Sequence, residues 1–297
     1  MVPHQFSRCH SILKMLERST STTNSFTRKL SSDSSSYVSV QDDEEIKELA
    51  ILTLQKKPIN TFCPNLLRDF TIAIKNIEQD KIKRAVIITS AFPGRFSAGL
   101  VLPSLLGKTL EEVKELWRWL QASWLSVYGT RLVTIAAING HAIAAGTAFA
   151  IGCDYRIMAE EDYLAGLTVI RMGIPVPFWL STQMANLLGK QEAAKAVQLG
   201  TLFTSHQALE NGLVDEIVPL NRVFEKARQE VPRWLDIPDH ARVAIKQDLR
   251  QSLIDRVNEV KDVEVDQNAA LVMQPNIQQN IARALKRLKE RKNNKPS

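Results

Sequence analysis

The chain has 297 residues, of which 44% are apolar and 24% are charged, as expected for a soluble globular protein with one large or two small domains. It has no run of about 18 apolar residues, which excludes a long transmembrane helix. Its three cysteines, Cys9, Cys63 and Cys153, show neither a metal-ligand spacing nor an even-numbered disulfide framework, which favours a reducing compartment.

The first 30 residues differ from the rest of the chain. They hold five Lys or Arg residues, one acid (Glu17) and nine Ser or Thr residues. On a helical wheel, apolar and basic side chains gather on opposite faces. The two faces are formed by Phe6, Cys9, Leu13 and Leu16, and by Arg8, Lys14 and Arg18. This composition is typical of a mitochondrial transit peptide and predicts the mitochondrial matrix, with Arg28-Lys-Leu-Ser31 as the processing site. The alternative is a disordered tail.

The net charge depends largely on that N-terminal segment. The chain carries +6 formally, and residues 1–30 contribute +4 (five basic minus one acidic), which leaves the remainder nearly balanced at +2. This balance argues against nucleic acid as a partner of the whole chain. The basic tail at 286–292 keeps RNA binding open, although the solvated face of a terminal helix explains it better.

We assign residues 31–45, which begin serine-rich, to a linker. Apolar runs then predict strands at Ile46–Leu54, Arg84–Thr89, Leu132–Ile138, Tyr155–Met158 and Leu213–Val218. Helical periodicity predicts helices at Asn65–Gln79, Thr109–Val127, Ala144–Ala150, Trp179–Leu188, Gln191–Leu199, Ser205–Asn211, Arg222–Trp234, His240–Asn258 and Pro275–Lys292. This order predicts an α/β core at residues 46–203 and a helical C-terminal region at 204–297.

Two turns of small residues each follow a buried strand, at Ser97–Gly99 and Ala144–Gly146. Small residues let a ligand approach the backbone closely, and N–H groups at the start of a helix have no intrahelical partner. Two such N–H groups that converge on one point can form an oxyanion hole. Either turn alone would indicate only a tight turn.

Several segments together resemble the crotonase superfamily, and within it the mitochondrial enoyl-CoA delta isomerases. The resemblance covers residues 48–291 and rests on Pro58-Ile-Asn60, Arg95-Phe-Ser-Ala-Gly-Leu100, Ile138-Asn-Gly140, Cys153-Asp-Tyr-Arg-Ile157, Met172-Gly-Ile-Pro-Val-Pro-Phe-Trp-Leu180, Ala196–Phe203, Gly212–Pro219 and Ile237-Pro-Asp-His-Ala-Arg242. The last of these favours the isomerase branch. The resemblance implies a spiral of ββα turns with a helical trimerisation region. It also implies an acyl- or enoyl-CoA thioester as substrate, and no other cofactor or metal.

The resemblance also implies the residues of the site. The two oxyanion-hole donors fall on the backbone N–H groups of Ala98 and Ala145, the latter at a position that is normally glycine. The substrate-binding positions are Ala98, Gly99, Leu100, Val101, Leu102, Ala145 and Thr168. Val101 stands where the family pattern has an aspartate. The tail at 286–292 corresponds to a segment that contacts coenzyme A phosphates.

The general base is the main departure from the family. Moving a double bond from C3 to C2 requires a carboxylate that removes a proton at C2 and returns it at C4. The family glutamate aligns with Val169, and the second carboxylate of the hydratases aligns with Ala148. No acid occurs between Asp162 and Glu192. The chain therefore resembles an enzyme whose base has been replaced.

Few residues offer a substitute base. Glu111, Glu112 and Glu115 lie on a helix predicted to cover the pocket, where a solvated face is the expected role. His141 could titrate near neutrality, but a polar loop role is expected. Arg171 stays protonated, and a structural ion pair is expected for it. Further along the chain, Asp154 and Arg156 are expected to hold a strand end. Phe178 and Trp179 fit the acyl site and the core equally well.

Three hypotheses remain open. The first is a weakened isomerase of fatty acid β-oxidation that relies on residual enolate stabilisation or an unrecognised base. The second is a non-catalytic acyl-CoA-binding protein, in homotrimers or in mixed trimers with active relatives. The third is a thioesterase-like reaction in the same oxyanion hole. Chemistry ranks the second slightly above the first.

Overall fold

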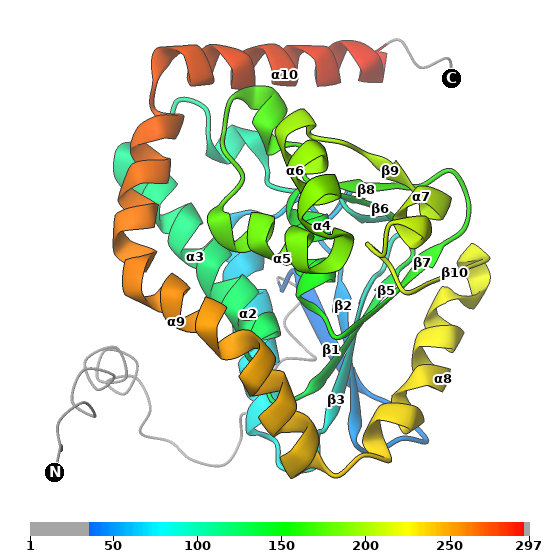
Figure 1. The fold of residues 1–297 in the computed structure, drawn as a ribbon. Coiled ribbons are helices and arrows are strands. Elements are labelled where there is room, and N and C mark those ends of the chain that lie inside the picture. The colour runs from blue at the N-terminus through cyan, green and yellow to red at the C-terminus, as the bar shows by residue number, and fades with distance from the viewer. Residues whose placement is uncertain (1–35, 294–297) are drawn as a thin grey trace, which may run out of the picture. The chain divides into compact units, whose positions relative to one another are not determined.

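The computed structural model describes residues 36–293 (Figure 1). The predicted transit peptide and its processing site therefore lie outside the described residues. Within the described residues, no helix is long and apolar enough to cross a membrane.

A six-stranded sheet forms the centre, in the order β1-β2-β3-β5-β7-β10. Its strands are β1 (Val38–Asp42), β2 (Leu49–Leu54), β3 (Ala85–Ser90), β5 (Val133–Ile138), β7 (Tyr155–Ala159) and β10 (Glu216–Val218). All pairs are parallel except β1 with β2. Every residue of β3 and β5 is buried, because helices cover both faces of the sheet.

Strand β1 corrects the linker prediction for residues 31–45. Val38 is buried and pairs with Leu54, and Asp42 pairs with Ala50. Only Val38 of the five β1 residues is buried, and only two of the five are apolar. A short edge strand between polar residues is therefore hard to distinguish from a linker without its pairing partner.

A second, four-stranded sheet follows the order β4-β6-β8-β9. It contains β4 (Gly94–Ser97), β6 (Gly140–Ile143), β8 (Leu164–Gly166) and β9 (Phe203–Thr204). None of these strands was predicted. Gly140 of β6 pairs with Gly94 of β4 so closely that an added Cβ would lie 1.9 Å from the carbonyl carbon of Gly94. Along the chain, β3 and β4 are followed by a helix, and so are β5 and β6. This order confirms the predicted ββα arrangement.

Helices cover the two faces of the large sheet (Figure 1). One core cluster joins the sheet to α2 (Pro64–Gln79), α3 (Leu110–Tyr128) and α4 (Ala145–Gly152), and a second joins it to α8 (Val223–Leu235). The chain between them forms α5 (Phe178–Leu188), α6 (Lys190–Leu199) and α7 (Ser205–Glu210). These helices agree with the predicted ranges to within two residues at each end, because their apolar stripes are regular.

After α8 the chain continues with α9 (Asp239–Val272) and α10 (Pro275–Asn293). Helix α9 has 34 residues and continues well beyond the predicted end at Asn258. Its buried side chains recur through the second half, at Val265, Ala269 and Val272. In Figure 1, α9 (orange) runs along α3, and α10 (red) crosses the end of the molecule.

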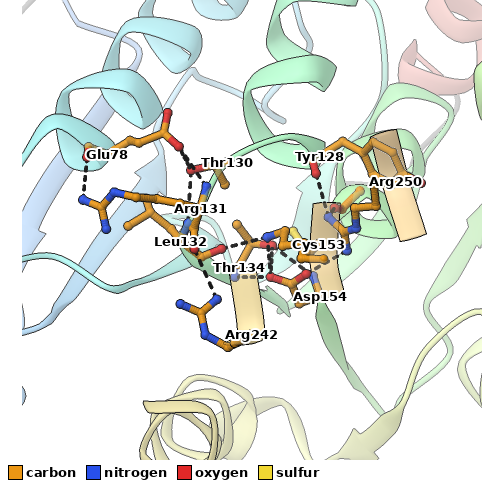
Figure 2. Close-up of polar contacts among 12 residues, drawn as sticks. Glu78, Tyr128, Thr130, Arg131, Leu132, Thr134, Cys153, Asp154, Arg242 and Arg250 are labelled. Carbon is orange, nitrogen blue, oxygen red and sulfur yellow. Dashed lines mark hydrogen bonds and ion pairs between the residues drawn. The ribbon is translucent and has the colours of Figure 1, made fainter. Parts of the chain in front are cut away.

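A buried polar network fastens α9 to the core (Figure 2). The carboxylate of Asp154 accepts hydrogen bonds from Lys246 and Arg250 on α9, each at 2.7 Å, and from the Thr134 N–H at 2.8 Å. Arg250 also donates to the Tyr128 carbonyl oxygen, at the end of α3. A separate ion pair joins Arg156 to Asp215 at 2.7 Å. The structural roles expected for Asp154 and Arg156 are therefore confirmed.

Candidate active site

The two predicted small-residue turns lie against each other. A Cβ added to Gly99 would lie 2.9 Å from the Ile143 carbonyl oxygen and 3.4 Å from the Ala145 nitrogen. A Cβ added to Gly146 would lie 2.9 Å from the Ser97 carbonyl oxygen. The backbones touch because strands β4 and β6 pair in parallel immediately before the turns. Glycine is required here both for space and, at Gly99, for a φ of +83°.

The second turn supplies one free donor. Ala144 has a φ of +51°, unusual for a residue with a side chain, and it immediately precedes α4. Ala145 is the first residue of that helix, and its N–H has no acceptor among the residues that the structure describes. Its side chain is buried. The Ala145 N–H is therefore available to an anionic oxygen at the positive end of the helix dipole.

The first turn requires a correction. The N–H of Ala98, which was predicted as the other donor, donates to the Ile59 carbonyl oxygen at 3.2 Å. The following residues form a parallel bridge to Phe62: the Phe62 N–H donates to the Gly99 oxygen, and the Val101 N–H donates to the Phe62 oxygen. In such a bridge the N–H of the intervening Leu100 points away from Phe62.

Leu100 is therefore the donor on this turn. Within the described part of the chain its N–H has no acceptor, and its neighbour Gly99 lies against Ala145. Sequence analysis had placed Leu100 only among the substrate-binding residues. The information that separates Leu100 from Ala98 is the pairing with Ile59 and Phe62, which the turn's own sequence does not contain.

Val169, which sequence analysis aligned with the family base, follows a strand that is bonded to the Ala144 turn. The Ala144 N–H donates to the Gly166 carbonyl oxygen at 2.8 Å, and the Thr147 hydroxyl accepts from the Gly166 N–H at 2.7 Å. These bonds hold the end of β8 against the start of α4. Thr168 and Val169 follow two and three residues later, with Val169 opening the short 3₁₀ helix η3 (Val169–Met172). Val169 is half-buried against the core and has no group that can exchange a proton.

The glutamates of α3 are committed elsewhere. Glu112 forms a capping box with Thr109 and accepts from Lys108 at 2.9 Å. The Lys108 hydrogen bond, followed by those from Thr109, lowers the pKa of Glu112 to about 2. Glu111 pairs with Arg118, and Glu115 is exposed. The solvated-face prediction for these three residues is confirmed.

His141 lies in strand β6 and not in a loop. Its Nδ1 accepts from the Leu164 N–H at 3.1 Å, and its ring meets Tyr163 edge to face at 5.1 Å. Burial, followed by the nearby charge of Arg95, lowers the pKa of His141. The imidazole is therefore neutral at physiological pH and joins β6 to β8.

Arg171 does not form the predicted ion pair with any residue that the structure describes. It is exposed, and its Nε donates to the Leu199 carbonyl oxygen at 3.4 Å. Ala148, which sequence analysis aligned with the second carboxylate of the hydratases, is buried in α4.

The structure also shows a buried carboxyl group on α9 that sequence analysis missed. Glu264 on α9 is 9% exposed and accepts from Gln121 Nε2 at 2.5 Å and Trp179 Nε1 at 3.1 Å. Burial raises the pKa of Glu264. The only hint in the sequence is a glutamate directly before Val265 in the buried stripe. Trp179 is fully buried, and its ring centroid lies 4.7 Å from that of Trp124, so it belongs to the core.

An open groove of about 880 Å³ lies between α8 and strands β1, β2 and β3 of the large sheet. It contains none of the predicted site residues. Asp43 and Glu45 on its rim both pair with Arg228, so part of its acidic charge is already neutralised.

The two sheets are built from ββα units, and two adjoining turns each carry an N–H group with no acceptor among the described residues. These features define a crotonase-type α/β fold. Residues 44–295 match the enoyl-CoA hydratase/isomerase family. The chain therefore belongs to that family.

Named relatives and solved structures agree with this assignment. The chain is 37% identical over 245 residues to mouse "enoyl-CoA delta isomerase 1, mitochondrial", covering 82% of this chain and 85% of the mouse protein. The human protein of the same name is 36% identical over 82% of this chain and 81% of its own length. The crystal structure of human mitochondrial delta3-delta2-enoyl-CoA isomerase superposes with a TM-score of 0.84 at 36% identity, covering 86% of this chain and 99% of that one. An enoyl-CoA hydratase from Bacillus halodurans shares the fold, with a TM-score of 0.76 at 23% identity, over 83% of this chain and 99% of its own.

Proposed function

We propose that this protein binds fatty acyl- and enoyl-CoA thioesters in mitochondria as a member of the enoyl-CoA delta isomerase branch. The thioester carbonyl oxygen lies between the backbone N–H groups of Leu100 and Ala145. The observation that carries this proposal is that these two N–H groups, on turns that touch, have no acceptor among residues 36–293. The mitochondrial isomerases among the relatives support the ligand class and the location, for which we propose the matrix.

We further propose that isomerisation is weak or absent. Two aligned N–H donors stabilise the enolate that forms when C2 loses a proton. The proton itself needs an acceptor that returns it at C4, and Val169 cannot serve. Loss of a general base costs on the order of 10²–10⁴ in rate. The chain therefore retains binding and charge stabilisation but lacks the proton shuttle.

A binding role follows from the same residues. A bound thioester that is not converted is retained or passed on, and a trimer of this chain, alone or mixed with active isomerases, provides a setting for that role. Thioester hydrolysis is less favoured, because the attacking water also needs a base. Of the candidates named from sequence, Glu111, Glu112 and His141 are engaged elsewhere, and Glu115 is exposed on the solvated face of α3.

The binding proposal is tested by calorimetric titration of residues 31–297 with octanoyl-CoA, using Gly99→Ala as the site variant. The added methyl group meets the Ile143 oxygen and the Ala145 nitrogen, so we expect octanoyl-CoA affinity to fall at least about tenfold. Gly212→Ala is the matched control: it also places alanine at positive φ (+75°), between α7 and β10. Equal affinities of the two variants would contradict this site, and no binding by the parent chain would contradict the function.

A further inference from the structure

Helix α10 contacts the loop that follows the first donor turn. The side-chain amide of Gln278 accepts from the Gly107 N–H at 3.1 Å and donates to the Leu105 carbonyl oxygen at 2.8 Å. The same Nε2 donates to the Val272 oxygen at 2.8 Å, at the end of α9. A single side chain thus ties the loop to the junction of the two C-terminal helices.

The same helix also holds the segment that carries position 169. Asn280 Nδ2 donates to the Met172 carbonyl oxygen at 3.2 Å, at the end of η3. The neighbouring Ile277 is 3% exposed, and its Cδ1 would lie 2.7 Å from a Cβ on Gly173. Helix α10 is therefore packed against η3 with no space for a larger residue at Gly173.

The two contacted segments belong to the two sides of the proposed thioester site. The loop begins at the 3₁₀ helix η2 (Leu102–Ser104), two residues after the Leu100 donor. The helix η3 begins at Val169, three residues after Gly166, which is bonded to the start of α4. A link between them limits how far the Leu100 turn can move from the Ala145 turn.

We propose that Gln278 is a positioning residue for the acyl-thioester half of the ligand, an inference that rests on the proposed function. Gln278 holds the loop that continues from Leu100 and so keeps the Leu100 N–H directed toward the thioester oxygen. Apolar residues on the contacted segments and on α10 pack into the core: Leu105 and Ile277 are buried, and Val169 and Met172 are partly buried.

This role predicts that a Gln278 variant loses affinity for the acyl thioester but not for coenzyme A alone. Coenzyme A without an acyl group has no thioester carbonyl, so its affinity does not depend on the Leu100 N–H. A side chain that merely stabilised the fold would instead change the affinities for both ligands together, or neither. The ratio of the octanoyl-CoA and coenzyme A affinities therefore separates positioning from general stabilisation.

The test compares Gln278→Met with Gln279→Met by calorimetry on residues 31–297. Methionine keeps the length of the side chain but removes its donor and acceptor. Gln279 is the next residue on the same helix and is exposed. We expect Gln278→Met to bind octanoyl-CoA about tenfold more weakly and free coenzyme A within about twofold of the parent chain. Gln279→Met should match the parent chain for both ligands.

A conservative replacement adds a second readout. In Gln278→Glu the carboxylate can accept from Gly107 but cannot donate to Leu105, and protonation restores one donor. Octanoyl-CoA affinity of this variant should therefore improve as pH falls toward the pKa of a glutamate, whereas that of Gln278→Met should follow the parent chain's pH profile.

Unchanged octanoyl-CoA affinity in Gln278→Met, or equal losses for both ligands, would overturn the positioning role. If the parent chain bound free coenzyme A but gained nothing from the octanoyl group, both this role and the proposed oxyanion hole would fail. If the parent chain bound octanoyl-CoA, Gly99→Ala weakened that binding and Gln278→Met matched the parent chain, the proposed function would stand without this inference.

Discussion

The N–H of Ala144 donates to the carbonyl oxygen of Gly166 at 2.8 Å, and this bond joins the turn before α4 to the segment that leads to Val169. Gly166 ends strand β8, and Ala144 directly precedes helix α4. Because Val169 follows Gly166 by three residues, this bond also fixes the backbone that leads to Val169. On the proposed alignment, that backbone presents a valine where the family has its base.

The Thr147 hydroxyl reinforces this junction and supplies a first prediction. It accepts from the Gly166 N–H at 2.7 Å and donates to the Ala142 carbonyl oxygen. Thr147→Val should lower the free energy of unfolding by about 1–3 kcal/mol, because two buried polar groups lose their partner. Urea unfolding monitored by circular dichroism measures the change. The control is Thr53→Val on β2, a half-buried threonine whose hydroxyl has no partner among the described residues. Equal midpoints for both variants would contradict the role of Thr147.

The Asp154 network predicts a larger effect on stability. Asp154→Ala leaves Lys246 and Arg250 buried without their carboxylate. Removing one partner of a buried ion pair costs about 3–5 kcal/mol, so the variant should unfold at much lower urea concentration. Asp248→Ala removes an exposed acid from α9 and should change stability by less than about 0.5 kcal/mol. A loss below about 1 kcal/mol for Asp154→Ala would show that α9 does not depend on this network.

Glu264 makes the stability of the protein depend on pH. Burial raises the pKa of Glu264 above the ordinary value of 4.5. At a pH above 4.5, the folded state therefore binds more protons at this site than the unfolded state does. The contribution of Glu264 to the free energy of unfolding therefore falls as pH rises from about 4.5 through the folded pKa. Glu264→Gln keeps an acceptor for Gln121 and Trp179 without the charge. Its thermal midpoint should match the parent chain at pH 4 and exceed it at pH 8.

A second variant at the same position tests the hydrogen bonds themselves. Glu264→Leu leaves the buried donors of Gln121 and Trp179 without an acceptor and should lose about 1–3 kcal/mol at pH 4. The loss should be smaller at pH 8, where the parent chain bears the cost of the buried charge. If Glu264→Gln showed the same difference from the parent chain at pH 4 and pH 8, the carboxyl group would not titrate with a raised pKa in the folded state.

Sequence analysis predicted the elements that depend on nearby residues in the chain and missed those that depend on distant segments. Helix α2 was predicted within one residue of its start, because Leu66, Phe70, Ile74 and Ile77 repeat along one face. Strands β4, β6, β8 and β9 have two to four residues each and were missed. Runs that short carry no periodicity, and their pairing depends on segments far away in the chain.

The candidate site shows the same limit at the level of single atoms. The two small-residue turns were found from composition, and the structure brings them together. Which N–H is free on the first turn depends on Ile59 and Phe62, almost forty residues earlier, so Ala98 was chosen in place of Leu100. Glu264 escaped notice because the apolar stripe of α9 was expected to end before it.

The most direct test of the central claim is turnover of a 3-enoyl-CoA by residues 31–297 beside the Val169→Glu variant, with products identified by mass spectrometry and chromatography. Ile170→Glu, one residue along η3, is the control for adding a carboxylate to this helix. We predict that the Val169→Glu variant forms the 2-enoyl-CoA at least about 10²-fold faster than the parent chain, which binds the thioester but barely converts it. Rapid isomerisation by the parent chain, unchanged by Val169→Glu, would contradict the account, and release of the free acid would identify a thioesterase.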